Sequence, residues 1–139
     1  MTRYAFDTDT LSLYDRMHPA VVRNVFHHLG DDIRLTTATV EESLGGWLAV
    51  VRAAKTPAQT EAAHRRLATA VRMLGTWDVF PMTAAAEVRF RQLLRQRLNV
   101  GGGDLRIAAV ALEFGATVVT RNVRDFRRIP GLTIEDWSV

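Results

Sequence analysis

The chain has 139 residues, 47% of them hydrophobic, which predicts one compact domain over residues 1–139. It has no apolar run of about 18 residues and reaches a charged Asp7 almost at once. We therefore expect neither a membrane span nor a secretory signal, and a cytoplasmic location. Cysteine is absent, which excludes disulfides, thiolate metal ligands and a cysteine nucleophile.

The charge pattern favours a polyanionic partner without requiring one. The net charge is +3 and the isoelectric point is near 10.2, because the basic residues are all arginine except for Lys55. The planar guanidinium of arginine matches phosphate, and basic residues outnumber acidic ones between Glu61 and Arg97. A nucleic-acid partner explains this excess, and so does a solvated basic helix face.

Short apolar segments alternate with longer helical patterns along the chain. In chain order, the patterns predict a strand at 3–7, helices at 11–17 and 19–29, a strand at 33–37, helices from 39 toward 54 and from 57 to 75, a strand at 78–80, helices at 83–97 and 104–114, and strands at 116–120 and 132–134. Alternating strands and helices form parallel sheets covered on both faces. We therefore predict an α/β fold, a three-layer α/β/α sandwich with a central, mostly parallel sheet of four to five strands.

Capping residues predict where several helices begin and end. Thr39 and Glu42, three residues apart, form a capping-box pattern that makes Thr39 the expected N-cap of the third helix. Thr56 precedes a proline suited to a first helical turn, and Thr83 is the expected N-cap of a later helix. Gly115 is the expected terminator of the helix before it.

Four acidic residues fall at predicted strand ends or helix starts. Asp7 ends the first strand, and Glu42 lies in the first helical turn after the second strand. Asp104 opens a helix, and Asp125 lies just past a later strand. Ligands of open α/β sheets bind at the carboxyl ends of the strands, so we expect these carboxylates to converge.

Converging carboxylates repel one another unless some are protonated or a cation binds. Oxygen ligands, without cysteine or a suitably spaced histidine pair, favour Mg²⁺ or Mn²⁺ over zinc. Such an ion lowers the pKa of bound water and holds phosphate oxygens during hydrolysis. The sequence therefore predicts a divalent metal site for phosphoryl chemistry.

Each acid also has a purely structural interpretation. Glu42 would be only a capping-box partner, Asp104 only an N-cap or first-turn acid, and Asp125 only a turn residue. Asp7 fits such an interpretation less well, because a carboxylate that ends an apolar segment is costly unless it is paired or metal-bound. The joint placement of the four acids is what supports a site.

These acids lie in stretches that resemble the PIN-domain ribonucleases, and within them the VapC-like toxins of bacterial type II toxin–antitoxin pairs. The resemblance spans nearly the whole chain and rests on the order of short stretches: 6–9 (FDTD), 39–42 (TVEE), 103–109 (GDLRIAA), 119–126 (VTRNVRDF), 129–132 (IPGL) and 135–137 (EDW). It implies Asp7 and Asp104 as central metal ligands, with Glu42 as a third acid. The fourth position falls to Asp125 or Asn122.

Residues beside these acids are further candidates. Family members more often have Asn or Ser where this chain has Asp9, which would either bind metal-held water or cap the next helix. Thr8 is a second candidate for a supporting role at the site. Within the matching stretches, the candidates for contact with RNA are Arg106, Arg121 and Arg124.

The resemblance also implies a reaction and partners. The reaction is hydrolysis of RNA by metal-activated water, leaving a 5′-phosphate and a 3′-hydroxyl. The partners are RNA, a cognate antitoxin that places Arg or Lys among the carboxylates, and a second copy of the chain. The homodimer is also expected from apolar residues of the first helices: Leu11, Leu13, Val21, Val22, Val25 and Phe26.

The aromatic residues and histidines leave alternatives open. Trp47, Trp77 and Trp137 would either stack on RNA bases or belong to the core or a dimer interface. His27 and His28 are expected to form a surface pair.

Two other functions fit parts of the sequence. Asp7-Thr-Asp9-Thr10 matches the DxDxT opening of haloacid-dehalogenase-type phosphatases, in which Asp7 would be the nucleophile. The chain is short for that fold, and Lys55 comes too early to be its basic residue. The non-catalytic alternative is a PIN scaffold that binds RNA or a protein partner without cleaving.

Overall fold

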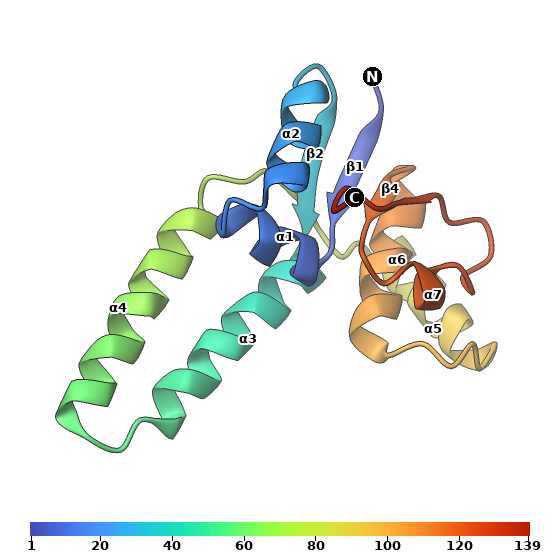
Figure 1. Cartoon of the computed structure of the whole chain (residues 1–139). Helices are drawn as coiled ribbons and strands as arrows, with labels where there is room; N and C mark the ends of the chain where they lie inside the picture. The colour runs from blue at the N-terminus through green and yellow to red at the C-terminus, as the bar shows by residue number, and fades with distance from the viewer.

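Five parallel strands form the centre of the molecule (Figure 1): β1 (Arg3–Phe6), β2 (Asp32–Thr36), β3 (Val79–Phe80), β4 (Thr117–Val119) and β5 (Ile134–Glu135). The computed structural model describes all residues from 1 to 139. The strand order is β3-β2-β1-β4-β5, and Phe6 of β1 lies opposite both Leu35 and Val119. The prediction of a central, mostly parallel sheet of four to five strands is confirmed.

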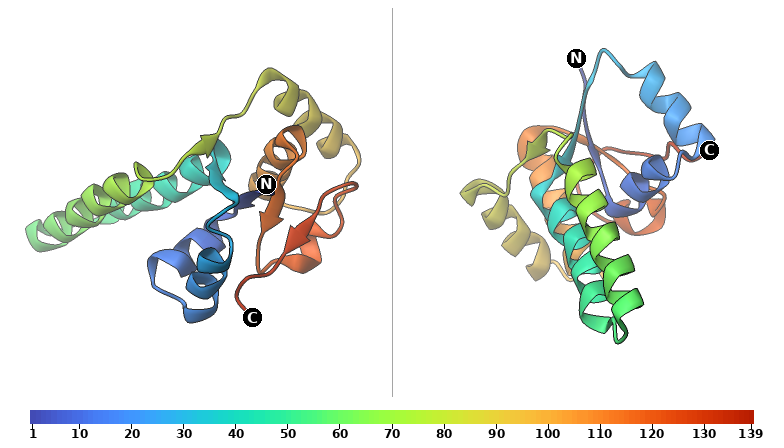
Figure 2. Two further views of the ribbon diagram at one scale, coloured as in Figure 1. Left: turned by 90° about the horizontal axis from the view of Figure 1, so that it is seen from above. Right: turned by 90° about the vertical axis from the view of Figure 1, so that its left-hand side faces the viewer.

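Seven helices surround this sheet: α1 (Thr8–Asp15), α2 (Pro19–His27), α3 (Thr37–Ala53), α4 (Pro57–Leu74), α5 (Ala84–Arg95), α6 (Gly102–Phe114) and α7 (Val123–Phe126). Figures 1 and 2 show α5 and α6 on one face of the sheet and α1 and α2 on the other. The three predicted layers are therefore present. None of the helices combines the length and the hydropathy needed to cross a bilayer.

Alternate residues of the central strands face two separate hydrophobic cores. Ala5 and Val118 face the first core, which the inner side chains of α5 and α6 complete. Phe6 and Val119 face the second core, together with the buried Trp137 near the end of the chain. Full burial of a large apolar side chain contributes roughly 1.5–3 kcal/mol, so these cores hold β1 and β4 firmly in register. The residues that directly follow the two strands are positioned as a consequence.

The helices α3 and α4 form a long hairpin that projects from the body as an arm (Figures 1 and 2). The start of α4 follows the prediction: the Thr56 hydroxyl accepts the Gln59 N–H at 3.1 Å, and Pro57 occupies the first turn. Gly75 is the C-cap of the same helix. The base of the arm adjoins the carboxyl end of β2, because α3 begins directly after that strand.

The start of α3 differs from the prediction, because another threonine caps it. Thr36 is the N-cap, and its hydroxyl accepts the Thr39 N–H at 3.0 Å. Thr39 is fully buried and donates its own hydroxyl to the Phe6 carbonyl at 3.0 Å. The capping-box prediction is therefore wrong, and Glu42 lies in the second turn of α3 with its carboxylate free of any cap.

Other element boundaries moved for local reasons. The helix predicted to run through Arg97 ends at Arg95, and Arg97 and Asn99 adopt left-handed backbone conformations with φ of 52° and 59°. Residues 123–126 form the short helix α7 where only a turn was expected. The last strand is shifted to residues 134–135, where it pairs with β4.

The aromatic residues divide between core and surface. Trp137 is 3% exposed, and its indole stacks on the His28 ring with the ring centroids 4.4 Å apart. Trp77 packs against Phe6 at the edge of the same core. His28 is therefore half-buried, and the prediction of a surface histidine pair is wrong for this residue. Trp47 lies on α3, outside both cores.

Candidate active site

Asp7 directly follows β1 at the carboxyl edge of the sheet and is only 4% exposed. Its Oδ1 accepts the Thr10 N–H at 2.8 Å, which makes Asp7 the N-cap of α1. Its Oδ2 accepts the hydroxyl of Thr120, the residue after β4, at 2.6 Å. Burial raises the pKa of the Asp7 carboxyl, while the hydrogen bonds from Thr120 and Thr10 oppose that rise. The two donors fix the carboxylate in one orientation.

Asp104 lies in the first turn of α6 and is half-buried. The negative charges of the other acids act on its carboxyl group. Gly101 is the N-cap of α6, so the interpretation of Asp104 as an N-cap is wrong. Burial, together with the negative charges of Asp7 and Glu42, raises the pKa of the Asp104 carboxyl to about 6. Because like charges act in this way only when they are near, Asp7 and Glu42 lie close enough to Asp104 for their charges to affect it.

Glu42 reaches this site across the start of α6. It is exposed on α3, and a Cβ placed on Gly103 would lie only 3.0 Å from its Oε2. A glycine at position 103 therefore leaves room for the Glu42 carboxylate beside Asp104. The free carboxylate of Glu42 and the absence of a side chain at Gly103 together bring α3 and α6 into one site.

Asn122 stands between Asp104 and Asp125. Its amide nitrogen donates to Asp104 Oδ2 at 3.3 Å and to Asp125 Oδ2 at 3.0 Å. The other oxygen of Asp125 accepts from Arg128 at 3.4 Å, and Arg128 also donates to the Asn99 carbonyl at 2.9 Å. Both oxygens of Asp125 are thus engaged by protein groups, whereas Asn122 directly contacts a central acid.

The neighbours of Asp7 differ in what they do. Asp9 is exposed and forms an ion pair with Arg121 at 3.5 Å, so its carboxylate points to a guanidinium rather than standing free beside Asp7. The Thr8 hydroxyl is buried and has no hydrogen-bond partner. Buried polar atoms normally have partners, so this hydroxyl is available to a bound group.

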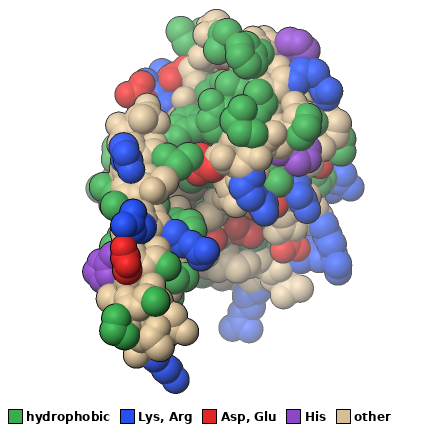
Figure 3. Space-filling view, turned by 60° about the vertical axis from the view of Figure 1, so that its left-hand side comes forward, with side chains coloured by type: hydrophobic (Ala, Val, Ile, Leu, Met, Phe, Trp, Pro, Cys, Tyr) green, Lys and Arg blue, Asp and Glu red, His purple; other side chains and the backbone are tan.

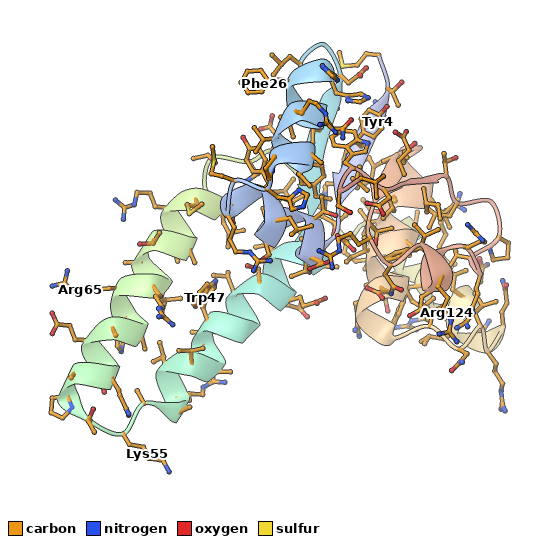
Figure 4. The ribbon with its side chains drawn as sticks, viewed as in Figure 1. Tyr4, Phe26, Trp47, Lys55, Arg65 and Arg124 are labelled. Atoms are coloured by element: carbon orange, nitrogen blue, oxygen red, sulfur yellow. The ribbon has the colours of Figure 1, made fainter.

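The candidate RNA-contacting arginines do not form one patch. Arg106 lies over the Phe90 ring, with its guanidinium carbon 4.6 Å from the ring centroid, and Arg121 pairs with Asp9. Arg124 is exposed on α7, on the side of the body away from the hairpin arm (Figure 4). Arg124 is therefore the one of the three that neither stacks on a ring nor forms an ion pair.

The acids are gathered at one edge of the sheet without forming a closed ligand shell. No group of three or more acidic or histidine side chains is arranged to hold a metal ion as it stands. Figure 3 shows acidic side chains on the floor of a hollow and basic side chains along its rim. The arrangement is an open anionic pocket with cations around it.

Comparison with known proteins identifies the family to which this fold belongs. The family model of the PIN domain matches residues 4–132 of the chain. The chain belongs to the PIN domain family. The resemblance proposed from the sequence and the PIN-like fold are both confirmed.

The PIN domain has relatives that match it over its full length. It is 30% identical over 142 residues to the tRNA(fMet)-specific endonuclease VapC of Shigella flexneri, a match that covers 99% of this chain and 100% of that protein. A protein of the same name from Salmonella typhimurium is 28% identical over 141 residues, and this match covers 99% of this chain and 99% of that protein. The structure of DNA-bound VapBC from Salmonella typhimurium matches with a TM-score of 0.78 and 26% identity, over 99% of both chains.

Three residues of this PIN domain site were not singled out by sequence reasoning. Thr120 directly follows β4, which pairs with β1, and a hydroxyl there was a detectable signal for a group facing Asp7. Arg128 follows Asp125 by three positions, a spacing that brings side chains together on a helix. Gly103 was interpreted only as part of a glycine run, because its space for Glu42 depends on the packing of α3 against α6.

Proposed function

We propose that this VapC-type ribonuclease hydrolyses RNA phosphodiester bonds at Asp7, Glu42 and Asp104, with Mg²⁺ or Mn²⁺ bound among them. The observation that carries the proposal is the approach of the Glu42 carboxylate to the start of α6, where its Oε2 would lie 3.0 Å from a Cβ on Gly103, the residue before Asp104. The charges of Asp7 and Glu42 also raise the pKa of Asp104. A carboxylate whose pKa is raised by the charges of neighbouring acids is stabilised by a cation. The site is therefore suited to a divalent ion.

The residues around the acids fit such an ion. Every candidate ligand is an oxygen, the donor type that Mg²⁺ and Mn²⁺ prefer. The partnerless hydroxyl of Thr8 lies beside Asp7, and Gly103 gives Glu42 room to approach. Asp7, Glu42 and Asp104 would hold the ion, with Asn122 or Asp125 at the fourth position.

The chain's own groups prepare this chemistry. When bound, a divalent ion neutralises phosphate charge and makes water more acidic. Thr120 and the Thr10 amide hold Asp7 in place and favour its ionised form. Asn122 donates to Asp104 and opposes the rise of its pKa, which remains about 6, below neutral pH. Two of the three acids, Asp7 and Asp104, are thus held by hydrogen bonds at the edge of the sheet that Glu42 reaches.

The relatives suggest a substrate and a protein partner. One relative is named as specific for tRNA(fMet), which makes initiator tRNA the first structured substrate to test. The similarity to a VapBC complex supports a cognate antitoxin that blocks the site by placing Arg or Lys among the carboxylates. We propose that the protein is the toxin of such a pair and acts on RNA in the cytoplasm.

A homodimer is part of the proposal, on a narrower surface than the sequence indicated. Leu11, Leu13 and Val21 are at most 5% exposed in the chain's own fold, so they are not free for a partner. Phe26, near the end of α2 (Figure 4), remains 67% exposed, and Leu29, just past that helix, remains 70% exposed. This exposed pair supports a contact between two copies.

The geometry does not favour the phosphatase alternative. A general acid at Asp9 must face the same substrate, whereas Asp9 forms an ion pair with Arg121.

One comparison tests the proposed function. The purified protein is incubated with a 5′-labelled single-stranded RNA, with initiator tRNA and with p-nitrophenyl phosphate, in EDTA, Mg²⁺ or Mn²⁺. We expect RNA cleavage that requires the metal, products with 5′-phosphate ends, and no release of p-nitrophenol. Asp104→Asn should be inactive, and Asp78→Asn, a change at an exposed acid away from the site, should match wild type.

The possible results separate the three functions. Release of p-nitrophenol without RNA cleavage would support the phosphatase. RNA binding without any cleavage, in the presence of either metal and with both RNAs, would support the non-catalytic domain.

A further inference from the structure

A basic surface without neutralising acids borders the active site on the side away from the hairpin arm. Its arginines are Arg95 and Arg97 at the end of α5, Arg124 within α7 and Arg127 at the C-cap of α7. All of them are exposed, and none forms an ion pair or donates a side-chain hydrogen bond to the protein. These arginines are called the α7 surface below. Their charge is available to a partner.

The two segments that carry the α7 surface are tied to each other. Arg128 donates to the Asn99 carbonyl at 2.9 Å, which joins the end of α7 to the loop after α5. Figure 1 shows α7 beside this loop. The same guanidinium contacts Asp125, the one acid of α7, at 3.4 Å. No acid occurs in residues 88–103, so the charge of this region stays uncompensated.

Two rows of side chains on α7 differ in their contacts. Asn122, Asp125 and Arg128 are spaced three residues apart and contact one another along one row. Arg124 and Arg127 have the same spacing, so they lie side by side in a neighbouring row that is exposed. Figure 3 shows basic side chains gathered on the part of the body opposite the arm. The outer row of α7 therefore faces solvent while the inner row holds the helix in place.

Arg97 occupies a backbone position that favours glycine. It follows Gln96, the C-cap of α5, and its φ is 52°. Glycine is usual at this position, because other residues are strained in the left-handed region. The chain therefore places a guanidinium here at a conformational cost that the fold itself does not require. Such a cost is typical of residues that serve binding.

We propose that the α7 surface binds the phosphate backbone of a double-stranded stem in the RNA substrate, while the single strand next to that stem reaches the acids. The inference rests on the proposed ribonuclease function and names a second contact surface for a structured RNA. The planar guanidinium matches phosphate oxygens. Proteins hold RNA duplexes mainly through phosphates and 2′-hydroxyls, with little contact to the bases.

The α7 surface lacks the aromatic groups that would favour a single strand. Phe90 of α5 is 6% exposed, and the guanidinium carbon of Arg106 lies 4.6 Å from the centroid of its ring. Phe126 of α7 is fully buried. Proteins hold single strands by stacking bases on aromatic side chains as well as by charge. Charge without a stacking group suits a duplex, in which the bases already stack on one another.

A DNA duplex is the competing partner, because it offers the same phosphates. The position of the surface favours RNA. Asn122, the N-cap of α7, donates to Asp104 at 3.3 Å, so α7 begins at the edge of the acidic pocket. A stem bound to the α7 surface therefore lies next to the place where RNA is cut.

The test measures binding on the Asp104→Asn background in EDTA, so that the RNA stays intact. The probes are a fluorescein-labelled RNA hairpin with a single-stranded tail, the tail alone, and a DNA hairpin of the same sequence. The double change Arg124→Gln and Arg127→Gln should lower the slope of log Kd against log salt for the RNA hairpin by about 1.8, as expected for two lost contacts with duplex phosphates. Binding of the tail alone should be nearly unchanged.

Matched variants and kinetics complete the test. Arg52→Gln and Arg72→Gln remove exposed cations of the hairpin arm, and both should bind the RNA hairpin like the parent. Arg97→Gly relieves the left-handed backbone, so it should weaken binding of the hairpin while Tm stays the same or rises. With the active protein and metal, the double variant at Arg124 and Arg127 should raise KM for the hairpin with kcat nearly unchanged.

The results distinguish this inference from the proposed function. If the wild type cleaves the RNA hairpin and the α7 variants, folded by circular dichroism, bind it like the arm variants, the α7 surface is overturned as a stem site and the ribonuclease stands. Equal loss of binding for the tail and the hairpin, or loss for the DNA hairpin alone, overturns the inference as well. If the wild type cleaves no RNA, the proposed function fails, and the binding measurements still decide whether the α7 surface holds a stem.

Discussion

Removing the charge of Asp104 should stabilise the metal-free protein. Burial and the nearby acids raise the pKa of this carboxyl to about 6, against an ordinary value of about 3.9. Two units correspond to at most roughly 3 kcal/mol, and because solvent screens a half-buried group, we expect about 1–2 kcal/mol. Asp104→Asn keeps the side-chain shape and an oxygen to accept from Asn122, so it removes mainly this electrostatic cost.

The size of this stabilisation depends on pH. The folded pKa lies above the unfolded one, so between about pH 4 and 6 the folded wild type binds more protons than the unfolded chain. Its stability therefore falls as pH rises through this window, whereas Asp104→Asn is unaffected at this position. The gap between the two proteins should be full at pH 7.5, shrink below pH 6 and close near pH 4.

The assay is a set of melting curves for both proteins at fixed ionic strength. In EDTA at pH 7.5, the variant should melt about 4–8 °C above wild type, since 1 kcal/mol shifts the Tm of a domain of this size by roughly 4 °C. With metal at a hundredfold excess over Kd, wild type should gain about 2.7 kcal/mol, and the variant should lose most of that gain. A variant that melts below wild type in EDTA and gains equally from metal would show that Asp104 is structural.

Three further changes test how the acids are held. Gly103→Ala places a methyl group 3.0 Å from the Glu42 carboxylate, so kcat should fall severalfold while Tm changes little, as steady-state kinetics and melting curves would show. Thr120→Val removes a donor that lowers the pKa of Asp7, so the acidic limb of the pH–rate profile should move to higher pH; an unmoved limb contradicts the role. Arg128→Met should weaken metal binding about 10-fold by calorimetry, the usual cost of disturbing a group behind the ligands.

Local chemistry made much of the fold predictable. The order of strands and helices followed from hydrophobic periodicity, and the start of α4 followed from Thr56 and the proline after it. Gly115, with φ of 64°, ended α6 as expected, because glycine adopts that conformation at no steric cost. The placement of Asp7 at a strand end was also correct, because it depends only on where an apolar run stops.

Features that depend on packing were not predictable. The choice between Thr36 and Thr39 as a cap was decided by the Phe6 carbonyl, which takes the Thr39 hydroxyl from a neighbouring strand. The orientation of Asn122 between two acids, and the space that Gly103 leaves for Glu42, exist only once distant segments meet. The sequence pattern contains the candidate acids but not the contacts that set their roles.

The central claim is that Asp7, Glu42 and Asp104 act as one metal-binding nuclease site. Its most direct test is the single-turnover cleavage rate of one RNA in Mn²⁺ for wild type and for Asp7→Asn, Glu42→Gln and Asp104→Asn, each shown to be folded by circular dichroism. We predict that every variant loses at least about 100-fold in rate, because each removes a ligand rather than a supporting group. Two or more variants that cleave within about threefold of wild type would contradict the account.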